Sequence, residues 1–161
     1  GLLCRGDFVQ EVEKAIARSS SQMHGLDLEI TESLAMENVA DNIPKLKALH
    51  AMGVGVAIDD FGTGYSSLAY ISRLPVAALK VDRSFIVNMT RGAEDMAIIS
   101  TVIALAHDLR LRAIAEGVDS EEQAQLLRQL GCDELQGYLL SRPVPIEQLG
   151  DLLRKIDGRS Q

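Results

Sequence analysis

The chain has few residues of the kinds that mark secreted, zinc-binding or nucleic-acid-binding proteins. Its two cysteines, Cys4 and Cys132, are far apart and lack a Cys/His ligand spacing, which argues against a disulfide framework or a zinc site. No apolar stretch is long enough to cross a membrane and the start lacks a signal peptide, so we expect a cytoplasmic segment with no membrane contact, although a longer parent protein can be membrane-bound. The net charge of −7 and the pI near 4.9 argue against binding of long nucleic acid.

Aromatic residues are also scarce, at 4% with no tryptophan, so Leu, Val, Ile and Ala must fill most of the core. That core is large enough for a globular fold, because 47% of the 161 residues are hydrophobic. We therefore expect a single domain over residues 1–161, with a polar, frayed tail at 158–161.

Short apolar segments alternate with helical patterns along almost the whole chain. The apolar segments are typical of buried parallel strands and lie at 26–30, 54–58, 77–81, 112–115 and just before Gln136. Apolar residues at helical spacing predict helices over about 7–17, 41–52, 93–109, 120–130 and 146–156. Repeated strand–helix units predict an α/β fold with a parallel sheet, either open or closed into a barrel.

Two of the predicted helices have clear boundary signals. Ser120 and Gln123 form a capping-box pattern, and Gly131 follows the last apolar position of the same helix. The helix over 41–52 has Gly53 as its stop, and its start at Asp41 predicts that Pro44 lies in the first turn.

Polar residues follow each predicted strand. In a parallel sheet the carboxyl ends of the strands meet at one edge, where function concentrates. Each residue by itself is more often simply solvated, but carboxylates at four successive strand ends with a lysine among them form a coherent group. The residues in question are Glu29 and Glu32, Asp59 and Asp60, Lys80 and Asp82, Glu116 and Asp119, and Gln136.

The adjacent pair Asp59 and Asp60, between an apolar strand and a Gly-rich loop, favours a divalent cation. Neighbouring carboxylates repel each other, and a hard cation such as Mg²⁺ or Mn²⁺ supplies the compensating charge. The alternative is a solvated turn, because Asp and Gly are common in turns. Lys80 has two interpretations as well: it takes part in catalysis, or it is a counter-ion for Asp82 or Glu116.

Five segments, in order along the chain, resemble the signature segments of the EAL domains, which hydrolyse the bacterial second messenger cyclic di-GMP. Similarity runs from about Asp7 to the last predicted helix. The segments are Leu28-Glu29-Ile30-Thr31-Glu32-Ser33, Ile58-Asp59-Asp60-Phe61-Gly62-Thr63-Gly64-Tyr65-Ser66-Ser67-Leu68, Leu79-Lys80-Val81-Asp82-Arg83-Ser84-Phe85, Ala115-Glu116-Gly117-Val118, and Gln136-Gly137-Tyr138-Leu139 with Ser141-Arg142-Pro143.

The resemblance implies a TIM-barrel-like (β/α)₈ fold with two Mg²⁺ or Mn²⁺ ions at the carboxyl ends of the strands. It implies metal-ligating and catalytic roles for the four acids Glu29, Asp59, Asp60 and Glu116, and a catalytic role for Lys80. The remaining roles it implies are substrate binding by Gln136, Tyr138 and Pro143, anchoring of the loop after the aspartate pair by Glu32, and supporting positions for Asp82 and Asp119. We expect Asp82 to support Lys80. Tyr65 and Tyr138 are candidates for stacking on guanine, with packing as the alternative.

The resemblance is incomplete at the start of the family barrel. The strand with the Glu-Ala-Leu tripeptide and a later strand with a ligand Asn are not in this chain. We therefore expect five or six strand–helix units, an open sheet edge, an incomplete metal site, and an isolated chain that is unstable, rearranged or completed by another chain. Asp119 stands where the family usually has Glu, and Leu140 where Phe is common.

Two other functions compete with cyclic di-GMP hydrolysis, and a third, that of a protein kinase, is dismissed. The first is a cyclic di-GMP effector that binds the dinucleotide without hydrolysing it. The absence of the Glu-Ala-Leu strand and of the ligand Asn favours this alternative. A phosphoacceptor receiver domain also pairs adjacent acids with a lysine, but its strand order differs from the one here. The Asp60-Phe61-Gly62 tripeptide of protein kinases occurs without their other motifs. The resemblance also implies a homodimer and fusion to upstream sensory or GGDEF-type domains, and the helix at 93–109 is our candidate for the dimer interface.

Overall fold

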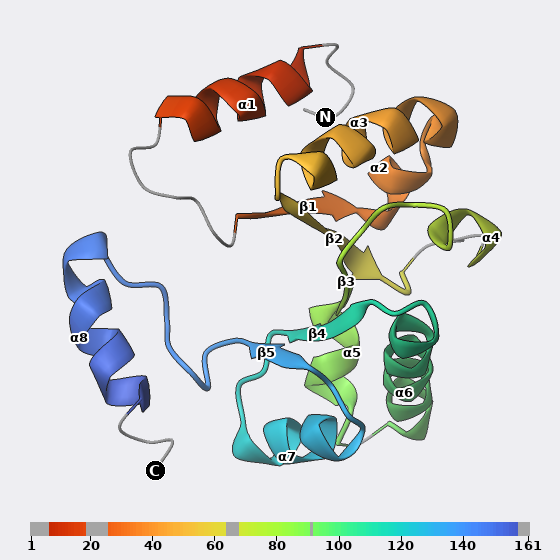
Figure 1. Ribbon diagram of the computed structural model, residues 1–161. Helices are drawn as coiled ribbons and strands as arrows, with labels where there is room; N and C mark the ends of the chain where they lie inside the picture. The colour runs from red at the N-terminus through yellow and green to blue at the C-terminus, as the bar shows by residue number, and fades with distance from the viewer. Residues whose placement is uncertain (1–6, 19–25, 64–67, 91, 158–161) are drawn as a thin grey trace.

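The computed structural model describes residues 7–18, 26–63, 68–90 and 92–157. Helices and strands alternate along these residues, as the sequence predicts (Figure 1). The strands are β1 (Asp27–Thr31), β2 (Gly55–Phe61), β3 (Ala78–Val81), β4 (Arg112–Glu116) and β5 (Glu134–Gln136). The helices are α1 (Phe8–Arg18), α2 (Glu32–Met36), α3 (Val39–Ala51), α4 (Leu68–Ile71), α5 (Arg83–Asn88), α6 (Ala93–Asp108), α7 (Glu121–Gln129) and α8 (Ile146–Asp157).

All five strands are parallel and lie in the order β1-β2-β3-β4-β5, so each strand pairs with the next one along the chain. The predicted α/β class and parallel sheet are therefore confirmed. Among the described residues the sheet is open, with β1 and β5 at its edges. The open sheet agrees with the expectation of an incomplete barrel. Because the strands are parallel, their carboxyl ends share one edge of the sheet.

The two faces of the sheet differ in character. On one face, Val56, Ile58, Leu79 and Val81 belong to the main buried cluster, together with helix residues such as Leu49 of α3 and Ile103 of α6. The opposite face has a separate small cluster of Ala57, Ala78 and Ile114. Because side chains alternate across a strand, this second face also holds the polar residues that occupy the same parity on each strand. These are Asp27, Glu29, Asp59, Lys80, Arg112, Glu116, Glu134 and Gln136.

Arg112 connects the edge strands at the amino-terminal end of this polar face. Its guanidinium donates to Asp27 Oδ2 of β1 at 3.1 Å and also bonds to Glu134 of β5. These two hydrogen bonds, with the carboxylate charges, hold the pKa of Arg112 above its ordinary value. β2 and β3 lie between β1 and β4 in the sheet, so the bond from Arg112 to Asp27 requires the sheet to curve. Arg112 therefore favours the curvature that brings the strand ends together.

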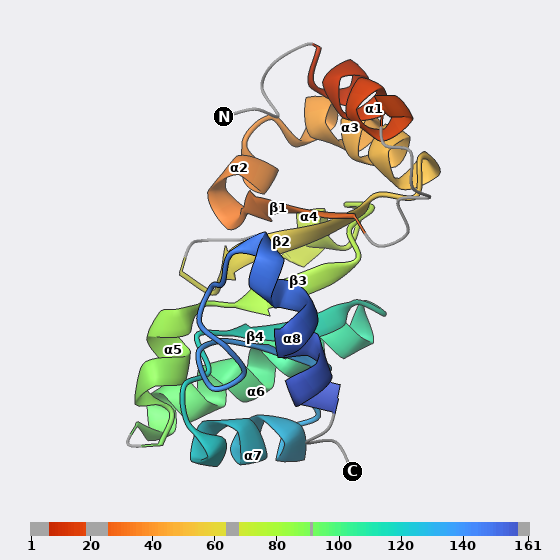
Figure 2. The ribbon, with the colours of Figure 1, turned by 90° about the vertical axis from the view of Figure 1, so that its left-hand side faces the viewer.

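Helix α8 lies on the other side of the sheet from α6 (Figures 1 and 2). Its apolar residues Ile146, Leu149 and Leu153 are exposed. In the described part of the chain, no helix combines the length and the apolar character needed to cross a membrane.

The helix boundaries confirm most of the local predictions. The capping box of Ser120 and Gln123 is present, and Gly53 and Gly131 end their helices with positive φ. The placement of Pro44 is wrong: α3 begins at Val39, so Pro44 lies inside the helix and not in its first turn. The sequence did not predict the three short helices α2, α4 and α5, because they have too few residues to show an apolar period.

Replacing Ser120 with alanine is expected to destabilise the chain by about 1 kcal/mol. Ser120 Oγ accepts the Gln123 N–H at 3.3 Å, and alanine leaves that N–H without its cap. Urea denaturation measures the change. Ser33→Ala, at an exposed position of α2, should shift stability by less than about 0.5 kcal/mol; equal effects of the two substitutions would contradict the capping role.

Candidate active site

Lys80 lies at the centre of a group of carboxylates at the carboxyl edge of the sheet. Its Nζ is 2.8 Å from Glu29 Oε1, 3.2 Å from Asp59 Oδ1 and 3.4 Å from Glu116 Oε2. We call these four residues the Lys80 cluster. Its acids come from β1, β2 and β4, and β3 carries the lysine between them, so the parallel topology joins residues that are up to 87 positions apart.

The charge of Lys80 is fixed by its surroundings. The side chain is only 2% exposed, and burial by itself would lower its pKa. Hydrogen bonds to Glu29 and Asp59 and the negative charges of Asp59 and Glu116 outweigh burial and raise the pKa above its ordinary value. Lys80 is therefore a permanent ammonium at neutral pH, able to donate hydrogen bonds and unable to accept a proton.

Asp59 and Asp60 point to different partners. The register of β2 against β3 shifts between Ile58 and Phe61, and Asp60 has a φ of 56°. Such a bulge changes the direction of the side chains on the bulged strand. Asp59 consequently reaches Lys80, whereas the Asp60 carboxyl group is close enough to Asp82 for that residue to affect its pKa. Burial, the charge of Asp59 and the nearby Asp82 raise the pKa of Asp60.

Asp82 lies directly before α5. Its carboxylate accepts the Ser84 N–H at 2.9 Å as the N-cap of α5, bonds to the Ser84 hydroxyl, and forms no ion pair with Lys80. Burial would raise the pKa of Asp82, but the hydrogen bonds from Ser84 lower it. The N-cap position turns the Asp82 carboxylate toward the start of α5, so Asp82 makes no direct ion pair with Lys80, and its supporting role stays a prediction.

Glu32 contacts the start of the loop that follows β2. Its Oε2 accepts the Gly62 N–H at 3.0 Å, and the residue is 4% exposed. The contact joins the first residue of α2 to the residue after β2, 30 positions later. Gly64, Tyr65 and residues 66–67, which belong to the same predicted loop, lie outside the described residues.

Replacing Glu32 with alanine is expected to lower the free energy of unfolding by about 1–3 kcal/mol, because the Gly62 N–H loses its acceptor in a partly buried place. Glu32→Gln keeps a carbonyl acceptor and should recover part of the loss. Thermal and urea unfolding measure both. Glu37→Ala, on the exposed side of the same segment, is the matched control. Equal stability of Glu32→Ala and the control would rule out an anchoring role.

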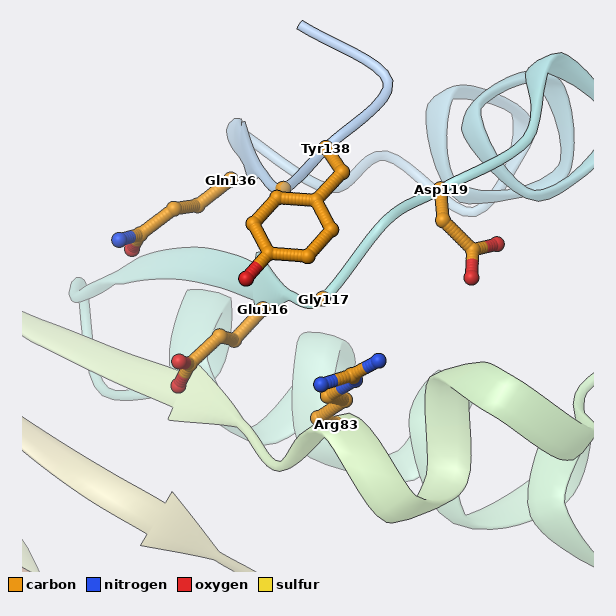
Figure 3. Close-up of a pocket in the computed structure, with 7 residues that line it drawn as sticks. Arg83, Glu116, Gly117, Asp119, Gln136 and Tyr138 are labelled. Carbon is orange, nitrogen blue, oxygen red and sulfur yellow. The ribbon is translucent and has the colours of Figure 1, made fainter. Parts of the chain in front are cut away.

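A pocket of about 140 Å³ opens beside the Lys80 cluster (Figure 3). Its lining residues are Arg83, Glu116, Gly117, Asp119, Gln136, Gly137 and Tyr138, which we call the Arg83 pocket. Glu116 belongs to both the cluster and the pocket, so the two are continuous. Tyr138 is 51% exposed and Arg142 lies 4.9 Å from its ring centroid, so this tyrosine is not a core residue.

The other predicted site residues divide between this pocket and its surroundings. Gln136 and Asp119 line the pocket, and the Asp119 N–H donates to Gln123 Oε1 at 2.9 Å. Pro143 lines a different hollow, next to α8. Arg83 lay within a signature segment, but sequence reasoning gave it no role. Its position at the start of a helix directly after the Lys80 strand was the available signal.

The donor set of the Lys80 cluster fits hard divalent cations. Carboxylate oxygens are the ligands that Mg²⁺ and Mn²⁺ prefer, and three of them converge within 3.4 Å of one point, the Lys80 ammonium. Among the described residues no group of three or more His, Cys, Asp or Glu side chains has the arrangement of a metal site. In this arrangement Lys80 supplies the positive charge on which Glu29, Asp59 and Glu116 converge.

Known proteins share this sequence and fold. The chain is 50% identical over 142 residues to the bifunctional diguanylate cyclase/cyclic di-GMP phosphodiesterase MucR of Pseudomonas aeruginosa, covering 88% of this chain and 21% of MucR. It is 47% identical over 152 residues to the cyclic di-GMP phosphodiesterase NbdA of the same species, covering 94% of this chain and 19% of NbdA. The chain thus spans about a fifth of the length of these curated relatives.

Solved structures agree with the sequence relatives. The structure of the MucR phosphodiesterase in complex with c-di-GMP has a TM-score of 0.88 and 47% identity, covering 92% of this chain and 60% of that chain. BlrP1 of Klebsiella pneumoniae, in a manganese and cyclic di-GMP complex, has a TM-score of 0.78 and 30% identity, covering 88% of this chain and 36% of that chain. The EAL domain family model matches residues 2–143. The chain belongs to the EAL domain family, with a five-stranded partial form of its TIM-barrel-like fold.

Proposed function

We propose that this chain forms part of a metal-dependent phosphodiesterase that adds water across one phosphodiester bond of cyclic di-GMP to give linear pGpG. The observation that carries the proposal is the Lys80 cluster, in which three carboxylates and a buried ammonium meet at the carboxyl ends of four parallel strands. In parallel α/β folds, this edge is where ligands bind and reactions occur.

In the proposed site Glu29, Asp59, Asp60 and Glu116 hold the divalent cations, Mg²⁺ or Mn²⁺. When bound, two such ions lower the pKa of a water molecule and offset charge on the phosphoryl oxygens. The BlrP1 complex, which contains manganese and cyclic di-GMP, supports this choice of cation.

Lys80 stabilises negative charge in the proposed reaction. Its ammonium lies 2.8 to 3.4 Å from the proposed ligand acids, so it donates hydrogen bonds toward the phosphoryl oxygens or the attacking water. Gln136 and Tyr138 bind the ligand from the adjoining Arg83 pocket, Pro143 contacts it from the hollow near α8, and Glu32 fixes the loop after β2.

The curated relatives support a larger signalling protein around this domain, because they are about five times as long as the part that matches. We propose that upstream sensory or GGDEF-type domains and a second copy of the chain are its partners. The dimer and the cytoplasmic location stay predictions.

The test is turnover of cyclic di-GMP with Mn²⁺ by this chain beside a version extended upstream, with pGpG measured by chromatography. The proposal expects pGpG from the extended version and a lower yield, or none, from this chain. Binding of cyclic di-GMP without product in both versions would support the effector alternative. A failure of both versions to bind cyclic di-GMP would overturn the proposed function.

A further inference from the structure

The side chain of Gln123 connects the end of β4 with α5. It is 5% exposed and makes three hydrogen bonds, all to backbone groups. Its Oε1 accepts the Asp119 N–H at 2.9 Å and the Ser120 N–H at 3.2 Å, and its Nε2 donates to the Ile86 carbonyl of α5 at 3.1 Å. A capping box accounts for the bond to Ser120. The bonds to Asp119 and Ile86 go beyond it and join the chain after β4 to a different helix.

This connection lies past the end of the pairing between β3 and β4. The register of these two strands ends with Val81 opposite Ala115, so Glu116 is one residue beyond the last pair. Glu116 pairs with Gln136 of β5 on its other side. Because α5 follows directly from β3, the bond from Gln123 to α5 continues the contact between the two chain segments where their pairing stops.

We call residues 117–120 the β4 loop, and two backbone hydrogen bonds hold it from the β5 side. The Val118 N–H donates to the Gln136 carbonyl at 3.0 Å, and the Leu139 N–H donates to the Val118 carbonyl at 3.0 Å. Figure 3 shows the β4 loop facing the start of α5. The loop is therefore held from both sides: by backbone bonds toward β5, and by the side chain of Gln123 toward α5.

We infer that Gln123 is a positioning residue that directs the Glu116 carboxylate for cation binding by fixing the β4 loop against α5. This inference rests on the proposed function, because it takes Glu116, 3.4 Å from Lys80, as a cation ligand. Mg²⁺ demands near-ideal coordination geometry, so the direction of each ligand matters. Groups behind a ligand set that direction. Gln123 acts through the backbone that follows Glu116 and is not itself a ligand.

The test measures Mn²⁺ affinity by calorimetry and the exchange of the Asp119 and Ser120 amide hydrogens by NMR, at a temperature where every variant is folded. Gln123→Met keeps the length of the side chain but loses its three hydrogen bonds. It should speed the exchange of both amides and weaken Mn²⁺ binding by about 10-fold, the lower end of the range for groups that support a metal ligand.

Gln123→Glu separates the two ends of the connection. Glutamate keeps an oxygen acceptor for the Asp119 and Ser120 N–H groups and is the usual capping-box residue at this helix position, so the start of α7 should persist. It loses the donor to the Ile86 carbonyl. This variant should therefore retain slow exchange of both amides and recover only part of the Mn²⁺ affinity.

Turnover in the upstream-extended version distinguishes positioning from a general loss of structure. Gln123→Met should raise the Mn²⁺ concentration that gives half-maximal pGpG formation by about 10-fold, and saturating Mn²⁺ should restore most of the rate. A merely structural role would instead lower the rate at saturating Mn²⁺ as well.

Two variants of the same helix region are the controls. Ser120→Ala weakens the start of α7 but leaves the three bonds of the Gln123 side chain, and Gln125→Met makes the same substitution at an exposed position. Both should leave the Mn²⁺ affinity unchanged. Unchanged Mn²⁺ affinity in Gln123→Met, or equal weakening by Ser120→Ala, would overturn the inference while leaving the proposed function intact. Absence of Mn²⁺ binding by the unaltered chain would overturn the proposed cation site and this inference with it.

Discussion

Replacing Lys80 with methionine is expected to lower the free energy of unfolding by about 2–3 kcal/mol in the absence of divalent cations. Removing one partner of a fully buried ion pair costs about 3–5 kcal/mol. We expect a smaller loss for Lys80→Met because the carboxylates of Glu29 and Glu116 are partly exposed. Methionine fills a similar volume, so the loss comes from carboxylates that repel one another without the ammonium between them.

The same variant should respond more strongly to Mn²⁺ than the unaltered chain. A cation bound by Glu29, Asp59 and Glu116 replaces the missing positive charge, so saturating Mn²⁺ should recover most of the lost stability. Thermal unfolding with and without Mn²⁺ measures both effects. Lys47→Met, at an exposed position of α3, should change neither stability nor the response to Mn²⁺. A stable Lys80→Met protein with no added response to Mn²⁺ would show that the acids do not form one site.

Replacing Asp59 with asparagine is expected to reduce both Mn²⁺ affinity and hydrolysis of cyclic di-GMP by more than 100-fold. Loss of a residue that only supports a metal ligand costs about 10–100-fold, and Asp59 is proposed as a direct ligand. Asparagine has nearly the same shape, so the fold should persist. Because Asp59 lies 3.2 Å from the buried ammonium, some stability is also lost.

Calorimetry with Mn²⁺ and a pGpG assay on the upstream-extended version measure the effects of Asp59→Asn. Asp108→Asn makes the same chemical change at the exposed end of α6 and serves as the control. It should leave the Mn²⁺ affinity and the rate of pGpG formation unchanged. Retention of full Mn²⁺ affinity in Asp59→Asn would remove this residue from the proposed ligand set.

The strands and the longer helices could be predicted from local pattern. β2, β3 and β4 contain short apolar runs, and each long helix has an apolar period with boundary residues such as Ser120 and Gly131. The placement of Pro44 failed because the residues from Val39 to Ala40 extend α3 beyond the apparent start at Asp41, and tertiary packing decides how far such an end extends.

Convergence at the strand ends was also predictable, because parallel topology brings the carboxyl ends to one edge. The directions of individual side chains were not. Asp60 turns toward Asp82 through a bulge and a positive φ, which no local pattern indicates. Arg112 bonds to Asp27, 85 residues away, and only the curvature of the open sheet brings this pair together.

The most direct test of the central claim is calorimetric titration of Mn²⁺ into the unaltered chain and into Asp59→Asn. We expect saturable binding by the unaltered chain and a more than 100-fold loss in the variant. Equal Mn²⁺ binding by the two proteins, or none by the unaltered chain, would contradict the account of the Lys80 cluster as a cation site.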